Sequence, residues 1–366
     1  MSPRRALPTA LALYVAVRLL GLVGLAVGAA ATGMSAHARL VRWDGQWYAA
    51  IAAHGYGLER LVPGGRTLTD LAFFPLYPFL ERLVASGTGL RHVDCGLIVA
   101  ALASVAAAWG IYAVAQRLYG VRVGVVTVVI WAALPIGIVE SMAYSETLFT
   151  AFAAWTVHAL LDRRWLLAGL LATLAGLTRP MGVAVAAAVV VAAAVAVARG
   201  ERDRLRAALG AVVAPLGWLG YVAWVAVRTD GPLGYFAVGR QWGNGFDGGA
   251  AFARWVVGFL SGAQPWLGLL LVLAVALLVA LLVLSVRDRQ PLPLLVYSAT
   301  MAFVAMTSSG YFGSKPRYLL PAFGLLLPAA VRLARARLAV TTAVLVVLTG
   351  GSAVYGAFWL LGPGPP

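Results

Sequence analysis

The chain has 366 residues, of which 62% are hydrophobic and only 11% are charged. Soluble domains are about half apolar and a quarter charged, so this composition excludes a water-soluble fold and predicts an all-α polytopic membrane protein. The net charge of +15 comes mostly from arginines that cluster between apolar runs, with Lys315 as the single lysine. That distribution is typical of membrane topology signals and argues against a nucleic-acid partner.

Apolar stretches of about twenty residues mark the candidate membrane spans. The first follows a basic flank and is too long for the core of a signal peptide, so we expect it to be retained. We predict about 11 transmembrane helices, near 10–31, 95–116, 121–139, 146–161, 164–178, 181–198, 208–227, 265–285, 291–308, 318–331 and 338–361.

Charge assigns the two sides of this bundle. Alternate short loops hold many more arginines than acids, which places them inside, in contact with anionic lipid headgroups. Two loops on the other side are long, at about 32–94 and 229–264, so water-exposed chemistry has room only there. We therefore expect one transmembrane domain over residues 1–366. The arginine- and alanine-rich composition suggests the plasma membrane of a bacterium, with an active site on the extracytoplasmic side.

The stretch "RWDGQWYAAIAAHGYG" opens the first long loop at residues 42–57. If it is helical, Asp44, Trp47, Tyr48 and Ile51 share one face, which puts a carboxylate on an aromatic stripe. The helix would lie along the interface and end at Gly55. The plainer alternative is an interfacial anchor whose Asp44 only faces water.

A second aromatic element, "FFPLYPFL" at 73–80, lies in the same loop and is stiffened by Pro75 and Pro78. Two amphipathic pieces in one loop could enclose a cavity with Asp44 at its mouth.

Two further motifs lie at predicted outer span ends. "AYSETLF" contains Tyr144 and Glu146, and "GLTRP" contains Arg179. Glu146 could simply be a helix-start carboxylate that the helix dipole stabilises, and Arg179 could simply snorkel to the interface. An arginine on the outer side also suits an anionic partner.

The last outer loop, "SSGYFGSKPRYLLP", carries Lys315 and Arg317 on either side of a proline, an arrangement that suits a phosphate. Arg18 lies inside the first span, where a charge normally faces the bundle or a polar cavity. We expect it to pair with one of the outer-end acids.

Together these features describe glycosyl transfer from a lipid-phosphate sugar. Cations suit the phosphate, aromatic faces suit sugar rings, and a carboxylate can act as a general base toward an acceptor hydroxyl. The rival hypothesis is a lipid-linked-sugar flippase or transporter without chemistry, although Arg18 is the only obvious mid-span ionisable residue that such a protein would use. A catalytically silent scaffold is the third alternative.

The four quoted motifs, in this order and at these spacings, resemble the PIG-V family of membrane mannosyltransferases in the GT-C superfamily. The resemblance covers most of residues 40–182. It implies a GT-C-like fold with interfacial helices in the first outer loop, a polyprenyl-phosphate mannose donor and inversion at the anomeric carbon. The acceptor would be the hydroxyl of a glycolipid, a glycan or a protein.

The resemblance also implies roles for single residues. Asp44 would be the catalytic base or would orient the acceptor, Glu146 would help to hold acceptor or sugar, and Arg179 would face the donor phosphate. The single acid of "WDGQ" argues against a divalent metal such as Mg²⁺ or Mn²⁺, because one carboxylate is a poor ligand set. The full set of expected substrate-binding residues is Arg42, Trp43, Trp47, Tyr48, His54, Tyr77, Tyr144, Glu146, Arg179, Lys315 and Arg317.

Overall fold

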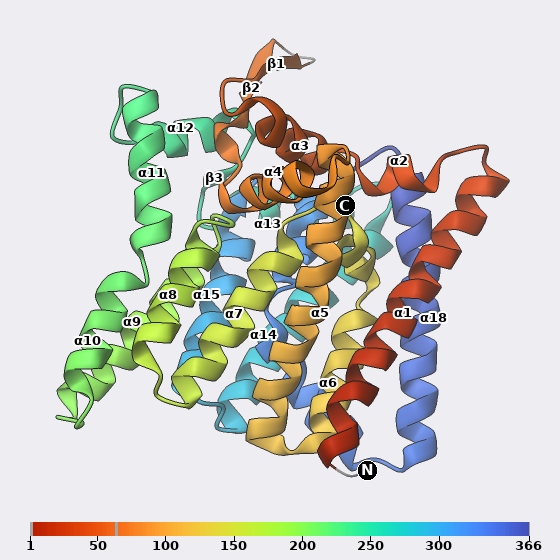
Figure 1. Cartoon of the computed structure of the whole chain (residues 1–366). Helices are drawn as coiled ribbons and strands as arrows, with labels where there is room; N and C mark the ends of the chain where they lie inside the picture. The colour runs from red at the N-terminus through yellow and green to blue at the C-terminus, as the bar shows by residue number, and fades with distance from the viewer. Residues whose placement is uncertain (1–2, 63–64, 366) are drawn as a thin grey trace.

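The computed structural model describes residues 3–62 and 65–365, which form a bundle of tilted helices with shorter elements across one end (Figure 1). Residues 1–2, 63–64 and 366 fall within the expected single domain, and 63–64 within its first long loop, but they lie outside the described residues. The prediction of an all-α membrane protein is confirmed, because helices make up most of the described chain and strands very little of it.

Five described helical segments are long and apolar enough to cross a membrane. One of these segments consists of two helices, α10 (Arg204–Val213) and α11 (Leu216–Arg228). The other four are α1 (Pro3–Ala31), α5 (His92–Tyr119), α14 (Pro265–Arg287) and α18 (Leu338–Leu361).

Shorter helices fill the remaining positions. These are α7 (Glu146–Leu161), α8 (Trp165–Gly176), α9 (Gly182–Ala198) and α15 (Leu292–Thr307). Every predicted span overlaps a helix, but the long segments number five, or seven if two bent pairs are counted as spans. The count of eleven therefore stays a prediction.

Three of the predicted spans are not continuous helices. The segment 121–139 is α6 (Val121–Ala132) followed by the 3₁₀ helix η2 (Pro135–Ser141), bent by 85°. The segment 318–331 is bent by 78° between the pieces 312–319 and 323–335, and 208–227 is interrupted before α11. Each break contains a proline, Pro135, Pro321 or Pro215, which removes a backbone hydrogen bond and crowds the preceding turn.

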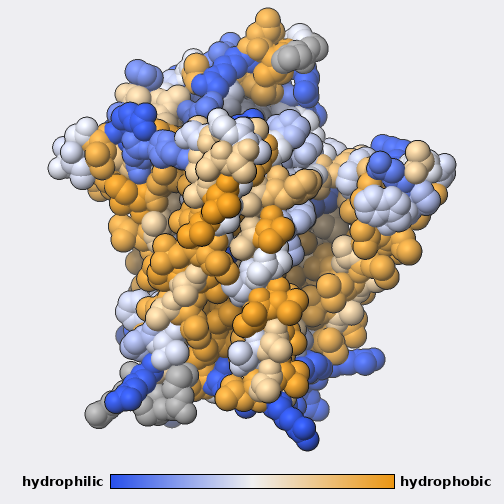
Figure 2. All heavy atoms as spheres, turned by 90° about the vertical axis from the view of Figure 1, so that its right-hand side faces the viewer, coloured by the Kyte–Doolittle hydropathy of each residue, from blue (hydrophilic) through white to orange (hydrophobic). Residues whose placement is uncertain are grey.

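The surface matches a protein that crosses a membrane several times. Figure 2 shows a broad hydrophobic belt over the helices, with hydrophilic groups gathered at the two ends. Side chains such as Val23, Val27 and Val347 are more than half exposed in this belt, where lipid rather than water would cover them.

Small residues bring the helices close together, as is usual in membrane bundles. A Cβ on Gly169 would meet the backbone of Gly210, and one on Gly217 would collide with the carbonyl oxygen of Thr173. These contacts press α10 and α11 against α8.

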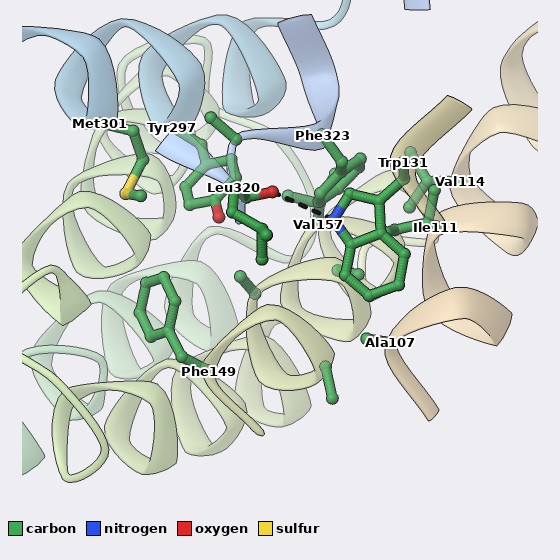
Figure 3. Close-up of a cluster of buried hydrophobic side chains, with 14 of the residues drawn as sticks. Ala107, Ile111, Val114, Trp131, Phe149, Val157, Tyr297, Met301, Leu320 and Phe323 are labelled. Carbon is green, nitrogen blue, oxygen red and sulfur yellow. Dashed lines mark hydrogen bonds between the residues drawn. The ribbon is translucent and has the colours of Figure 1, made fainter. Parts of the chain in front are cut away.

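A buried cluster joins α5, α6, α7 and α15 in the middle of the bundle (Figure 3). Within it the indole nitrogen of Trp131 donates a 3.0 Å hydrogen bond to the carbonyl oxygen of Leu320. This bond fixes the chain just after Arg317, at the proline break where the backbone lacks helical partners.

The two long loops fold at the same end of the bundle (Figure 1). The first contains α2 (Ala36–Leu40), α3 (Asp44–His54), the antiparallel strands β1 (Glu59–Val62) and β2 (Arg66–Thr69), η1 (Asp70–Ala72) and α4 (Leu76–Thr88). The second contains α12 (Gly234–Gln241), β3 (Gly245–Phe246) and α13 (Ala250–Leu260).

The last loop completes this end. It begins with β4 (Ser308–Ser309), which pairs with β3, and continues with η3 (Phe312–Ser314) and α16 (Lys315–Leu319). After the bend, η4 (Phe323–Leu326) and α17 (Leu327–Arg335) return into the bundle, where α17 packs against α6. The helix predicted at 42–54 forms over Asp44–His54, two residues shorter at its start, and it ends at Gly55, whose φ of 81° suits glycine. The two small strand pairs were not predicted.

Candidate active site

Asp44 occupies a strained position at the start of α3. The preceding residue, Trp43, has φ 52° and ψ −112°, a backbone conformation that a bulky residue rarely adopts. Next to it, a Cβ on Gly45 would lie 3.1 Å from the carbonyl oxygen of Ala143, so glycine allows α3 to approach this segment closely. The amide of Ala143 in turn donates to the carbonyl oxygen of Leu40 at 3.0 Å. The start of α3 is therefore held against the residues that lead into α7.

Four charged side chains meet at this point. Arg317 on α16 lies 2.9 Å from the carboxylate of Asp44 and 3.2 Å from that of Glu146, and Arg179 lies 2.7 Å from Glu146. Two acids and two arginines balance in charge, as buried ions must. We call Asp44, Glu146, Arg179 and Arg317 the rim cluster.

The members of the rim cluster differ in their access to solvent. The side chain of Asp44 is 20% exposed, whereas those of Arg317 and Glu146 are 8% and 1% exposed. An incoming hydroxyl could therefore reach Asp44, whereas Glu146 is enclosed by the two arginines that it pairs with.

Hydroxyl groups extend the rim cluster. The hydroxyls of Tyr48 and Ser145 are 2.7 Å apart, and Arg179 donates to Ser145 at 3.1 Å. The Arg317 guanidinium also faces the ring of Tyr144 at 5.0 Å, a cation–π contact. Burial raises the pKa of Tyr48 and of Tyr144, so both phenols stay protonated.

Segments far apart in the sequence converge here. Besides α3 and the turn before α7, the cluster draws on the loop between α8 and α9, which carries Arg179. The amide of Leu76 donates to the carbonyl oxygen of Leu177 at 3.0 Å, which ties "FFPLYPFL" to "GLTRP". All four motifs quoted from the sequence are thus connected by contacts with one another, and Arg317 adds a fifth segment.

Other aromatic residues of the first two motifs pack against one another next to the site. Trp47 packs on Phe73 and Trp242, with ring centroids 5.7 and 5.1 Å away. Tyr77 is buried, packs against Tyr48 at 4.8 Å and donates to a backbone carbonyl oxygen at 2.8 Å.

Arg42 and His54 lie outside the rim cluster. The Arg42 guanidinium stacks 4.1 Å from the ring centroid of Trp43 and donates to the carbonyl oxygen of Gly362 at 3.5 Å. His54 ends α3 in an exposed position, ten residues and therefore roughly 15 Å along the helix from Asp44.

The side chain of Lys315 makes structural contacts within the protein. Its ammonium group donates to the carbonyl oxygens of Ala305 at 2.6 Å and Ser308 at 2.9 Å, at the end of α15. It also faces the rings of Phe252 and Phe312 at 4.9 and 5.3 Å. The neighbouring Arg317, not Lys315, is the cation that reaches Asp44.

Arg18 forms an ion pair inside the bundle. It lies 3.7 Å from Glu140, which also accepts a 2.9 Å hydrogen bond from the hydroxyl of Tyr14. Arg18 also donates to the carbonyl oxygens of Gly137 and Ala132. We call Arg18, Glu140 and Tyr14 the bundle cluster.

The donor set of the rim cluster does not fit a divalent metal ion. Both of its carboxylates face arginines, whereas Mg²⁺ and Mn²⁺ need several free oxygen ligands. Among the described residues, no group of three or more His, Cys, Asp or Glu side chains lies close enough together to hold a metal ion.

Similar folds occur in solved membrane glycosyltransferases. ArnT from Cupriavidus metallidurans, bound to undecaprenyl phosphate, matches at 18% identity and a TM-score of 0.53, over 89% of this chain and 60% of that one. An oligosaccharyltransferase from Archaeoglobus fulgidus, in complex with Zn and sulfate, matches at 14% identity and a TM-score of 0.57, over 97% and 53% of the two chains. The protein therefore has the fold of the GT-C membrane glycosyltransferases, and it spans about half to three fifths of the length of these two enzymes.

AglB from the same archaeon, solved with an inhibitory peptide and a dolichol-phosphate, matches at 12% identity and a TM-score of 0.53, over 98% of this chain and 56% of that one. In sequence, residues 75–226 match the family described as dolichyl-phosphate-mannose-protein mannosyltransferase. No curated protein matches in sequence. The expected resemblance to GT-C enzymes is confirmed, and none of these similarities points to the PIG-V family in particular.

The sequence analysis did not single out Ser145, which contacts both Tyr48 and Arg179. Ser145 lies inside the motif "AYSETLF", but only Tyr144 and Glu146 were expected to bind substrate.

Proposed function

We propose that this protein is a membrane glycosyltransferase that moves a sugar from a polyprenyl-phosphate donor to a hydroxyl acceptor with inversion. The observation that carries the proposal is the pairing of a partly exposed carboxylate, Asp44, with a guanidinium, Arg317, at a strained helix start. Mannose is the proposed sugar, because the family matched by residues 75–226 is described as mannosyltransferases.

In this proposal Arg317 and Arg179 receive the donor phosphate. Two guanidinium groups that share one oxygen of Glu146 lie close enough together to contact one phosphate. Glu146 is nearly inaccessible, so its role is to position the two arginines rather than to touch acceptor or sugar.

The reaction then needs one base and one stabilised leaving group. The acceptor oxygen attacks the anomeric carbon on the face opposite the phosphate, and its proton passes to Asp44. The bond between that carbon and the phosphate oxygen breaks, and the arginines stabilise the charge that builds on the polyprenyl phosphate. Because Arg317 holds Asp44 at 2.9 Å, a phosphate that draws Arg317 away would also release the base.

The wider setting is also part of the proposal. One domain over residues 1–366 would act at the extracytoplasmic face of a bacterial plasma membrane, on a glycolipid, glycan or protein hydroxyl. ArnT bound to undecaprenyl phosphate and AglB with a dolichol-phosphate support a lipid-phosphate partner for a chain of this fold.

The test is to incubate the purified protein with polyprenyl-phosphate mannose and bacterial lipid extract, and to identify products by mass spectrometry. We expect a product that gains one hexose and an equal amount of free polyprenyl phosphate. Movement of the intact lipid between leaflets of a vesicle, with no transfer, would instead favour the flippase. Neither transfer nor movement would favour a silent scaffold.

A further inference from the structure

The indole of Trp47 lies one helical turn after Asp44 on α3. Trp47 is only 6% exposed and packs against Phe73 and Trp242. The indole nitrogen of Trp242 donates to a backbone carbonyl oxygen at 3.0 Å, whereas that of Trp47 makes no hydrogen bond within the described part of the chain. It is also not sealed inside the protein, unlike the indole nitrogen of Trp218, which is fully buried without a partner. Trp47 therefore offers an unused donor to a ligand.

An arginine lies over the same ring. The guanidinium of Arg60 on β1 is 4.6 Å from the ring centroid of Trp47. Arg66 on β2 pairs with Val62, which is two residues from Arg60, so both arginines lie on one face of the hairpin (Figure 1). That face also approaches the second long loop, because a Cβ on Gly243 would lie 3.9 Å from the Arg66 guanidinium. We call Arg60, Arg66 and the indole nitrogen of Trp47 the basic face.

Neighbouring acids leave the positive charge of the basic face free. Arg60 and Arg66 are both exposed, and among the described residues neither forms an ion pair. Glu59 is next to Arg60 in sequence but points to the other face of β1. Asp70, at the foot of the hairpin, is buried and accepts hydrogen bonds from two backbone amides at 3.0 and 2.9 Å. The hairpin is therefore braced at its foot, and its two arginines can attract an anion.

The basic face differs from the rim cluster in place and in charge balance. Arg317 and Arg179 are nearly buried, and Asp44 and Glu146 offset their charge. Trp47 follows Asp44 by three residues, a spacing at which two helical side chains are neighbours with Cβ atoms about 5–6 Å apart. A group bound at the basic face therefore lies beside the proposed base, one turn further along α3, and not between the two arginines assigned to the donor phosphate.

We propose that the basic face binds an anionic group of the acceptor, which makes the acceptor an acidic glycan. A guanidinium supplies charge and fixed N–H groups to a carboxylate or phosphate, and the indole nitrogen adds a neutral donor. Because the basic face and Asp44 are neighbours, the anion belongs to the accepting sugar or to the sugar next to it. The inference rests on the proposed glycosyl transfer, and it narrows the choice among glycolipid, glycan and protein acceptors.

The experiment measures the binding of two probes, trigalacturonic acid and the neutral trisaccharide galactotriose, to the protein in nanodiscs. Arg60→Gln removes one charge of the basic face, and Trp47→Phe removes the indole nitrogen but keeps an aromatic ring. Arg254→Gln is the matched control, because Arg254 is an exposed arginine on α13, at the same end of the bundle, and forms no ion pair among the residues that the structure describes.

We expect the wild type to bind trigalacturonic acid more tightly than galactotriose. Arg60→Gln should weaken the binding of trigalacturonic acid about tenfold, the usual effect of losing a hydrogen bond to a charged group, and should not change the binding of galactotriose. Trp47→Phe should weaken the binding of the acid by a smaller factor, and Arg254→Gln should leave it unchanged.

Three results would overturn the inference. The first is equal affinity of the wild type for the two probes, and the second is an equal loss in Arg60→Gln and Arg254→Gln. The third is a weaker affinity of Arg60→Gln for undecaprenyl phosphate, because Arg60 would then serve the donor.

The transfer assay separates this inference from the proposed function. A mannosylated product without an acidic group, formed by Arg60→Gln at the wild-type rate, keeps the transferase and overturns the inference. Selective binding of trigalacturonic acid through Arg60, with no transfer of sugar, supports a site for acidic glycans and overturns the transferase.

Discussion

The rim cluster and the bundle cluster use the same chemistry in different ways. Each pairs a buried arginine with a glutamate and a tyrosine nearby, yet in the bundle cluster Arg18 also donates to two backbone carbonyls. In the rim cluster, Asp44 keeps a fifth of its side chain exposed. Burial of a charged pair therefore does not mark a functional site by itself, and the proposed site depends on an acid that is both paired and partly exposed.

The largest effect should follow from removing Arg317. Arg317→Ala leaves Asp44 and Glu146 without their shared cation and removes a donor to the leaving phosphate. We expect transfer to fall about 10³-fold, at the upper end of the range for losing one such donor. The transfer rate of Arg317→Lys should lie between those of the wild type and Arg317→Ala, because lysine keeps the charge but not the forked geometry. Wild-type rates in Arg317→Ala, measured with polyprenyl-phosphate mannose, would remove the rim cluster from the chemistry.

Breaking the bundle cluster should cost stability instead of rate. Glu140→Gln leaves the buried Arg18 without a counter-charge, and we expect a loss of about 3 kcal/mol in the free energy of unfolding. Thermal unfolding in detergent and the transfer rate per folded molecule check this together. If the transfer rate falls and the melting temperature does not, the bundle cluster takes part in the reaction and the proposed distinction between the two clusters is wrong.

Lys315 should behave like the bundle cluster although it lies two residues from Arg317. Lys315→Met removes two hydrogen bonds to carbonyl oxygens at the end of α15, so we expect about 2 kcal/mol less stability. Its affinity for undecaprenyl phosphate should not change. A weaker affinity at unchanged stability would support the phosphate role predicted from the sequence.

The last prediction concerns Glu81 on α4, a buried acid with no hydrogen-bond partner among the described residues. Burial raises its pKa from 4.5 to about 9. The folded protein therefore keeps a proton that the unfolded chain releases, and stability falls as the pH rises from 4.5 to about 9, by at most about 1.4 kcal/mol per pH unit.

Glu81→Gln should flatten that dependence, because the amide cannot ionise. Melting temperatures of both proteins between pH 5 and pH 9 provide the measurement. Parallel curves for the two proteins would mean that Glu81 is charged in the fold and has a partner after all.

The sequence predicted local features of the site well. The aromatic stripe of α3 and its end at Gly55 follow from helical periodicity and from glycine's backbone freedom. The structure buries Trp47, Tyr48 and Ile51, the three residues expected to share that face with Asp44. The membrane class follows from composition alone.

Pairings between distant segments could not be predicted. Asp44 and Arg317 are 273 residues apart, and no local pattern distinguishes Arg317 from Lys315 as the partner of an acid. The prolines that break three spans were visible, but their consequence depended on neighbouring helices.

The most direct test of the account is the transfer rate of Asp44→Asn, measured beside its affinity for undecaprenyl phosphate. The amide keeps the shape of the side chain and cannot take a proton, so transfer should fall by at least about 10²-fold. Because Arg317 then keeps only Glu146 as an acidic partner, the lipid phosphate should bind as well as before or more tightly. Transfer at the wild-type rate in this variant would contradict the claim that Asp44 is the base.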